Sequence, residues 1–132
     1  MDDTGLISIR SVHGVDETMA RLLAAIDKAG LLIFADIDHR RNAAEVSMDL
    51  RPTRLILFGH AKGGTPLMQV RQTAGIDLPL KILIWQDEHG ATWVSYNDPR
   101  WIVTRHGLGL AGEAGADAMA AGMTKLITAA TA

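Results

Sequence analysis

The sequence predicts an α/β fold of the α+β-like kind, a two-layer sandwich in which helices cover a mixed sheet. Two observations carry this prediction. Strand-like runs alternate with segments whose apolar residues recur at helical spacing, and the last two runs, 80–86 and 91–96, are joined directly by a short polar loop that ends in Gly90. Because that loop predicts an antiparallel hairpin, a purely parallel sheet is disfavoured.

The strand predictions depend on runs that are apolar throughout or alternate with period two. Such runs lie at 6–12, 31–38, 54–59, 80–86 and 91–96. The run at 80–86 has large apolar residues on both faces, which is typical of a strand inside a sheet. We therefore expect its arm of the hairpin to lie away from the sheet edges.

The helix predictions depend on caps and on apolar spacing. Asp16 and Gly30 bound the first helix, and a short second helix is expected at 39–48. In the sequence Gly63-Gly64-Thr65-Pro66, Thr65 can cap and Pro66 suits the first position, so a third helix is expected over 66–74.

Two further helices are expected near the C-terminal end. Asp98 can cap a short helix at 100–106. The glycine-rich stretch GLGLAGEAG at 107–115 is expected to be a flexible loop. After it, an apolar stripe that includes Met119 and Met123 predicts a last helix, with the methionines in a core or a dimer contact.

Composition bounds the class of protein. With 132 residues, 48% of them hydrophobic, the chain is expected to form a single domain over 1–132. A net charge of −2 without a basic stripe argues against nucleic acid as a partner, and the apolar runs are too short to cross a membrane. The N-terminus lacks the apolar region of a secretory signal, so a cytoplasmic location is expected. The absence of cysteine excludes thiolate metal sites and thiol nucleophiles.

Four segments together resemble the bacterial and archaeal family called domain of unknown function 302. They are IDH at 37–39, LILFGHAKGGTPLMQ at 55–69, DLPLKILIWQDEHGATWVSYNDP at 77–99 and RHGL at 105–108. The resemblance implies a fold related to the TATA-box-binding-protein-like, helix-grip architecture and often a homodimer, and it implies no established reaction. The chain departs from the family at His60-Ala61, which follows Gly59 where the family commonly has Asn-Pro.

The loop from His60 to Thr65 is the first candidate site. Free N–H groups at a helix start, with Lys62, Gly63 and Gly64, would favour an anion such as a phosphate or a carboxylate. The order of residues is not that of a Walker A loop, because the lysine precedes the glycines. An ordinary strand-to-helix turn, with glycine for its dihedral angles and Thr65 as its cap, explains the same residues and is favoured.

The histidines are the second candidate. His39 and His60 each follow a strand, so they would approach each other at one sheet edge if those strands were parallel neighbours. Two histidines and a carboxylate would suit iron or zinc, but the spacing matches no ligand pattern and no metal or cofactor is assigned. A simpler interpretation than a metal site is that His39 is a turn residue and His60 is a solvated loop residue.

Tyr96 completes the candidate set. Its phenol could serve as an acid or base if its pKa were lowered, although Asn97-Asp98-Pro99 is also an ordinary turn before a helix. We therefore expect one ligand-binding site at a sheet edge, formed by residues that could recognise a small, anionic molecule. The candidates are His39, His60, Lys62, Gly63, Gly64, Thr65, Tyr96 and His106.

Three functions stay open on the sequence alone. The leading hypothesis is a homodimeric domain that binds a small molecule. The second is an enzyme, either metal-assisted through the histidines or an acid/base enzyme through Tyr96 and a histidine. The third is an assembly module without a ligand. Convergence of His39, His60, Tyr96 and His106 would favour the first two, and scattered positions of these four on the surface would favour the third.

Overall fold

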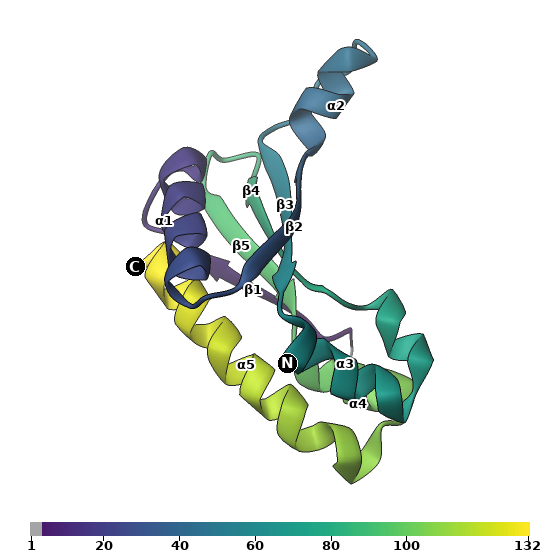
Figure 1. Ribbon diagram of the computed structural model, residues 1–132. Coiled ribbons are helices and arrows are strands. Elements are labelled where there is room, and N and C mark those ends of the chain that lie inside the picture. Colours follow the sequence, from purple (N-terminus) through teal and green to yellow (C-terminus); the bar gives the residue numbers. More distant parts are fainter. Residues whose placement is uncertain (1–3) are drawn as a thin grey trace.

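The computed structural model describes residues 4–132, which form a five-stranded sheet with helices on one face and at one end (Figure 1). The strands are β1 (Leu6–Arg10), β2 (Leu32–Asp38), β3 (Thr53–Gly59), β4 (Leu80–Gln86) and β5 (Thr92–Asn97). Their order is β1-β5-β4-β3-β2. The α/β class and the β4–β5 hairpin are confirmed, and β4 lies inside the sheet as expected.

The sheet differs in one respect from the mixed sheet that was predicted, because every neighbouring pair of strands is antiparallel. The segment between β2 and β3 holds only a short helix, α2 (His39–Glu45), and it reverses the direction of the chain. A parallel pair needs a crossover connection that returns to the start of the sheet. The consequence is that the C-terminal ends of β2 and β3 lie at opposite ends of this strand pair.

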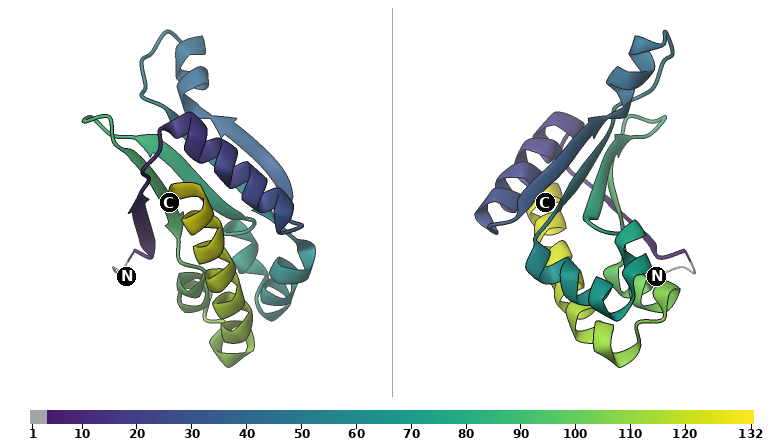
Figure 2. Two further views of the ribbon diagram at one scale, coloured as in Figure 1. Left: turned by 90° about the vertical axis from the view of Figure 1, so that its left-hand side faces the viewer. Right: turned by 45° about the vertical axis from the view of Figure 1, so that its right-hand side comes forward.

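The remaining helices surround one face and one end of the sheet. They are α1 (Val15–Lys28), α3 (Ala61–Val70), the 3-10 helix η1 (Gln72–Ile76), α4 (Pro99–His106) and α5 (Gly109–Thr131). Helices α1 and α5 cover one sheet face, while α3, η1 and α4 gather at its lower end (Figure 2). Alternate side chains of β3 and β4, such as Ile56 and Ile82, meet Leu22 and Ile127 in one fully buried core.

No helix in the described part of the chain lies over the opposite sheet face (Figure 2). That open face holds half-buried apolar side chains from three strands. They are Leu55, Leu57, Leu83, Trp85 and Trp93. The two indole rings stack with centroids 6.2 Å apart. Such a face is unusual for a sheet exposed to water, whose outward side chains are commonly polar.

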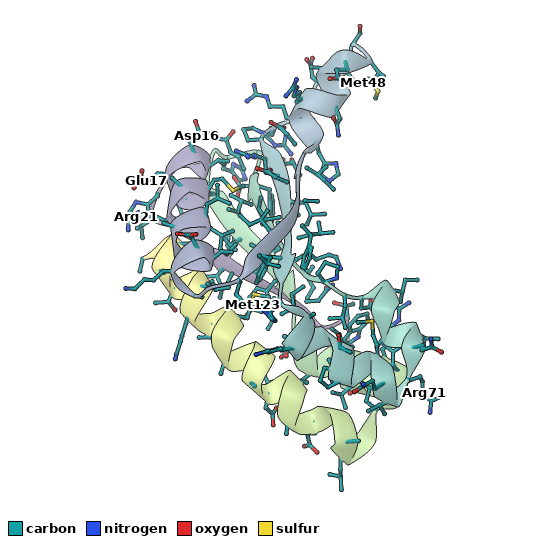
Figure 3. The ribbon with its side chains drawn as sticks, in the orientation of Figure 1. Asp16, Glu17, Arg21, Met48, Arg71 and Met123 are labelled. Atoms are coloured by element: carbon teal, nitrogen blue, oxygen red, sulfur yellow. The ribbon has the colours of Figure 1, made fainter. Side chains whose placement is uncertain are left out.

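Helix α2 and the residues after it form an arm that projects away from the rest of the molecule (Figure 1). None of the residues of α2 is buried. Val46, Met48 and Leu50 are exposed in the following segment, and Met48 lies at the tip of the arm (Figure 3). The second helix is also shorter than the 39–48 expected.

Three local predictions near glycines were wrong. The third helix begins at Ala61 and not at Pro66, because the His60 side chain accepts the Lys62 N–H (3.1 Å) and caps the helix five residues earlier. The stretch 107–115 is no flexible loop, since Gly107 ends α4 in a left-handed conformation and α5 follows directly. In α1 the capping position is Gly14, and Asp16 lies in the first turn, where its charge suits the helix dipole.

Candidate functional site

A pocket of about 830 Å³ lies between α3 and α5, at the end of the sheet where β3 stops. Its volume falls in the range of pockets that hold small molecules. We call it the α3–α5 pocket. Its lining is dominated by glycine, alanine and flexible apolar residues from the two helices. These include Gly63, Gly64, Met68, Gly115, Ala118, Met119, Gly122 and Met123.

Small residues on α5 create the space. Gly115, Ala118 and Gly122 follow one another three and four positions apart, so they share one helix face. A Cβ atom added at Gly122 would meet no atom within 4 Å, and one added at Gly63 would lie 3.4 Å from Met119 Cε. Met123 extends from α5 into the space beside the sheet (Figure 3). The wall of the pocket therefore consists of glycines, which leave space, and of methionines, whose flexible side chains can adjust to a ligand.

The polar groups of the pocket come from the first turns of α3. His60, Lys62 and Thr65 are exposed and line it, whereas the rest of the lining is apolar or glycine. The His60 ring holds the helix start through its Nδ1 atom. No aspartate or glutamate is among the lining residues in the described chain. The pocket is thus an apolar space with cationic character at one side.

Five of the predicted site residues meet in this pocket. They are His60, Lys62, Gly63, Gly64 and Thr65. His39, Tyr96 and His106 do not line it. Because β2 and β3 are antiparallel, His39 and His60 lie at opposite ends of the pair, about 20 Å apart along a seven-residue strand. The expected single site at one sheet edge is therefore not formed.

The predicted anion cradle is also absent from this position. Gly63, Gly64 and Thr65 lie inside α3 and not ahead of it. The N–H groups of Gly63 and Gly64 donate to the His60 carbonyl oxygen at 3.0 and 3.3 Å, so they are not free for a ligand. These glycines instead allow close approach of Met119 and Leu78 to the helix backbone.

His106 belongs to a separate, polar cluster between α4 and η1. Its Nδ1 bonds to the Thr73 hydroxyl (3.0 Å) and its Nε2 to the Asp77 carboxylate (2.5 Å). Asp77 also accepts two hydrogen bonds from Arg105, whose guanidinium lies over the Trp101 ring. The polar groups of this cluster therefore form hydrogen bonds with one another, and these bonds join α4 to η1 and Asp77. Residues 4–132 contain no group of three or more His, Cys, Asp or Glu placed to hold a metal ion.

Tyr96 lies on β5, packed against the main core. Burial raises the pKa of its phenol, and the nearby charge of Asp98 raises it further. A raised pKa disfavours proton transfer by a tyrosine near neutral pH. The prediction that Asp98 caps the following helix is confirmed, since its side chain accepts the Arg100 N–H at the start of α4.

Sequence reasoning missed the half of the pocket that α5 supplies. Gly115, Ala118 and Gly122 fall in and after the stretch expected to be a loop. A signal was present, because small residues recur there at helical spacing beside methionines. Nothing local, however, indicates that α3 would lie opposite.

The model of the family "Domain of unknown function DUF302" matches residues 7–130. The chain belongs to this family. A crystal structure of an uncharacterized conserved DUF302 protein from Bacillus stearothermophilus superimposes with a TM-score of 0.85, covering 96% of this chain and 98% of that one. At 16% sequence identity the likeness shows a shared fold. The family resemblance expected from the sequence is confirmed.

Curated relatives of this DUF302 chain carry a different kind of name. They include "Fluoride-specific ion channel FluC 1" of Brucella suis biovar 1 (strain 1330) and its namesake in Brucella abortus biovar 1 (strain 9-941). Each is 42% identical over 120 residues, which are 91% of this chain but 47% and 44% of the relatives. The chain thus spans about half the length of these proteins. Within residues 4–132, no helix has the length and apolar character needed to cross a bilayer.

Proposed function

We propose that this DUF302 chain is a binding domain for a small molecule with an apolar body, held in the α3–α5 pocket. The observation that carries the proposal is the pocket itself, about 830 Å³ of space lined by glycines, alanine and methionines. An apolar wall exposed to water favours an apolar occupant, at about 25 cal/mol per Å² of surface removed from water. The methionine side chains can adjust to its shape.

A neutral, apolar fluorescent probe tests this proposal. N-phenyl-1-naphthylamine should gain fluorescence on binding to the protein and should be displaced by other apolar molecules. Gly122→Leu should abolish the gain, because the new side chain enters open space in the pocket. Ala121→Leu adds the same side chain at an exposed neighbouring position outside the lining and should have no effect. Equal binding by both variants, or none by the native protein, would reject the proposal.

The open sheet face favours a second function, assembly of two copies of this chain. Its half-buried leucines and tryptophans give this face apolar area, and the projecting arm carries exposed Val46, Met48 and Leu50. In a two-fold dimer the same face meets itself, so one apolar patch is enough. The homodimer expected from the sequence is therefore proposed to form through this face.

Molar mass in solution tests the dimer. Light scattering after size exclusion should give twice the chain mass for the native protein and the single mass for Leu83→Glu, which places a charge in the middle of the open face. Circular dichroism checks that the variant is folded. A native monomer, or a folded Leu83→Glu dimer, would contradict this interface.

The names of the Brucella relatives suggest a setting for the domain. A channel must cross the bilayer with helices or a closed barrel. We propose that, in those longer proteins, the half that matches this chain is an accessory domain and that ion conduction belongs to the other half. For this chain the same proposal implies a role beside a membrane protein and no fluoride transport of its own.

A further inference from the structure

We infer that the occupant of the α3–α5 pocket is a single alkyl chain that ends in a carboxylate, with the carboxylate beside Lys62. This inference extends the proposed function and depends on it, since it specifies the chemistry of the molecule that the pocket would hold. Two features support it independently: the elongated shape of the apolar lining and the distribution of charge around it.

The lining follows α5 over several turns. Its residues on that helix run from Gly115 to Leu126, about 16 Å at the rise of an α-helix. From Gly115 to Met123 the lining residues of α5 are small or unbranched, and Leu78 and Met68 also line the pocket. An apolar lining that extends over several turns of one helix suits an extended alkyl chain better than a compact ring system, because more of the methylenes then contact the wall.

The charge lies at one side. Lys62, in the first turn of α3, is the charged side chain of the described lining, and no carboxylate of that lining balances it. None of the ion pairs found among residues 4–132 involves Lys62 or His60. A ligand with an anionic end would supply the missing counter-charge and would still place its apolar body in the pocket. A cationic or neutral end would leave the lysine unbalanced.

Matched ligands of equal chain length test the charge. Decanoate, 1-decanol and decyltrimethylammonium are each titrated against bound N-phenyl-1-naphthylamine. We expect decanoate to displace the probe about fivefold more tightly than 1-decanol, the size of one exposed ion pair, and the ammonium compound to bind most weakly. Lys62→Met should remove the advantage of decanoate over 1-decanol, while Lys125→Met, on α5 outside the lining, should keep it.

The outcomes separate this inference from the proposed function. If 1-decanol and decanoate bind equally to the native protein, or if Lys62→Met does not reduce the preference, the carboxylate is wrong while the apolar pocket stands. Decyl phosphate is titrated in the same way to test for a phosphorylated ligand. If it binds more tightly than decanoate, the anionic end of the ligand is a phosphate and not a carboxylate. If the neutral probe binds and no alkyl ligand displaces it, the alkyl chain is wrong. If the probe does not bind at all, the proposed function fails as well.

Discussion

At the scale of single residues, Asp98 connects the sheet to α4. Its side chain is almost fully buried, at 1% exposure, and it accepts the backbone N–H of Arg100 at 2.9 Å. The Arg100 guanidinium adds two hydrogen bonds, at 3.1 and 2.8 Å. These bonds hold the pKa of the Asp98 carboxyl below its usual range. The ionised carboxylate is therefore the form that the folded protein prefers.

Asp98→Asn tests this charge. A carboxyl with a lowered pKa in the folded state stabilises it above the pKa of the unfolded chain, and this contribution is lost as pH falls through the folded value. We expect the variant to be less stable by about 1 kcal/mol at pH 7, and the difference to shrink below about pH 4. Urea unfolding at the two pH values measures it. A difference that does not depend on pH would contradict this role of the charge.

Gly5 is a second residue with a specific role. Its φ is +77°, and a Cβ atom there would lie 2.5 Å from Trp101 Cγ. Gly5→Ala should therefore destabilise by about 1–3 kcal/mol, from strain and overpacking together. Gly90→Ala is the matched control, since φ is +82° but no atom lies within 4 Å. Thermal unfolding should show the larger loss for Gly5→Ala, and equal losses would rule out the contact with Trp101.

At the scale of elements, predictions succeeded where the signal is local. The β4–β5 hairpin follows from its own loop, where the Asp87 carboxylate accepts the N–H groups of His89 and Ala91. The Asp98 cap follows in the same way. The helix over 66–74 was misplaced because Gly63-Gly64 resembles a helix entrance, whereas Gly63 accommodates Met119, which is distant in the sequence, and Gly64 accommodates Leu78. The antiparallel pairing of β2 and β3 could not be predicted either, because it joins residues that lie far apart in the sequence.

Two glycines of α5 lie in contrasting surroundings: Gly122 has open space beside it, and Gly112 is closely packed. A methyl group introduced at Gly122 would meet no atom within 4 Å, so Gly122→Ala should stabilise the helix by about 0.5–1 kcal/mol. At Gly112 the same methyl group would lie 2.6 Å from Leu108 Cβ, and Gly112→Ala should destabilise. Denaturant unfolding compares the two variants. Equal effects of both would contradict the contrast between open space at Gly122 and close packing at Gly112.

At the scale of the whole molecule, the pocket and the open sheet face are both products of the arrangement of elements. Residues that line the pocket come from β2, β3, α3, β4 and α5. The sequence identified its α3 side, from His60 to Thr65, through local chemistry. It could not place α5 opposite, because that position depends on how α5 packs against α1, α3 and α4.

The relation to the Brucella channels gives a prediction for the intact chain. Purified protein added to liposomes loaded with fluoride should release none, because the proposed division of roles assigns ion conduction to the other half of the longer relatives. A fluoride electrode measures the release, and an ionophore supplies the positive control. Fluoride efflux that rises with protein concentration would refute the proposed division of roles.

The central claim is that a small apolar molecule binds between α3 and α5. Amide chemical shifts, recorded while 1-decanol is titrated into labelled protein, test it most directly. We predict saturable shifts at Gly63, Gly64, Gly115 and Gly122, and none at Gly90 in the hairpin loop. Shifts confined to the open sheet face around Trp85 and Trp93, or no shifts at all, would contradict the claim.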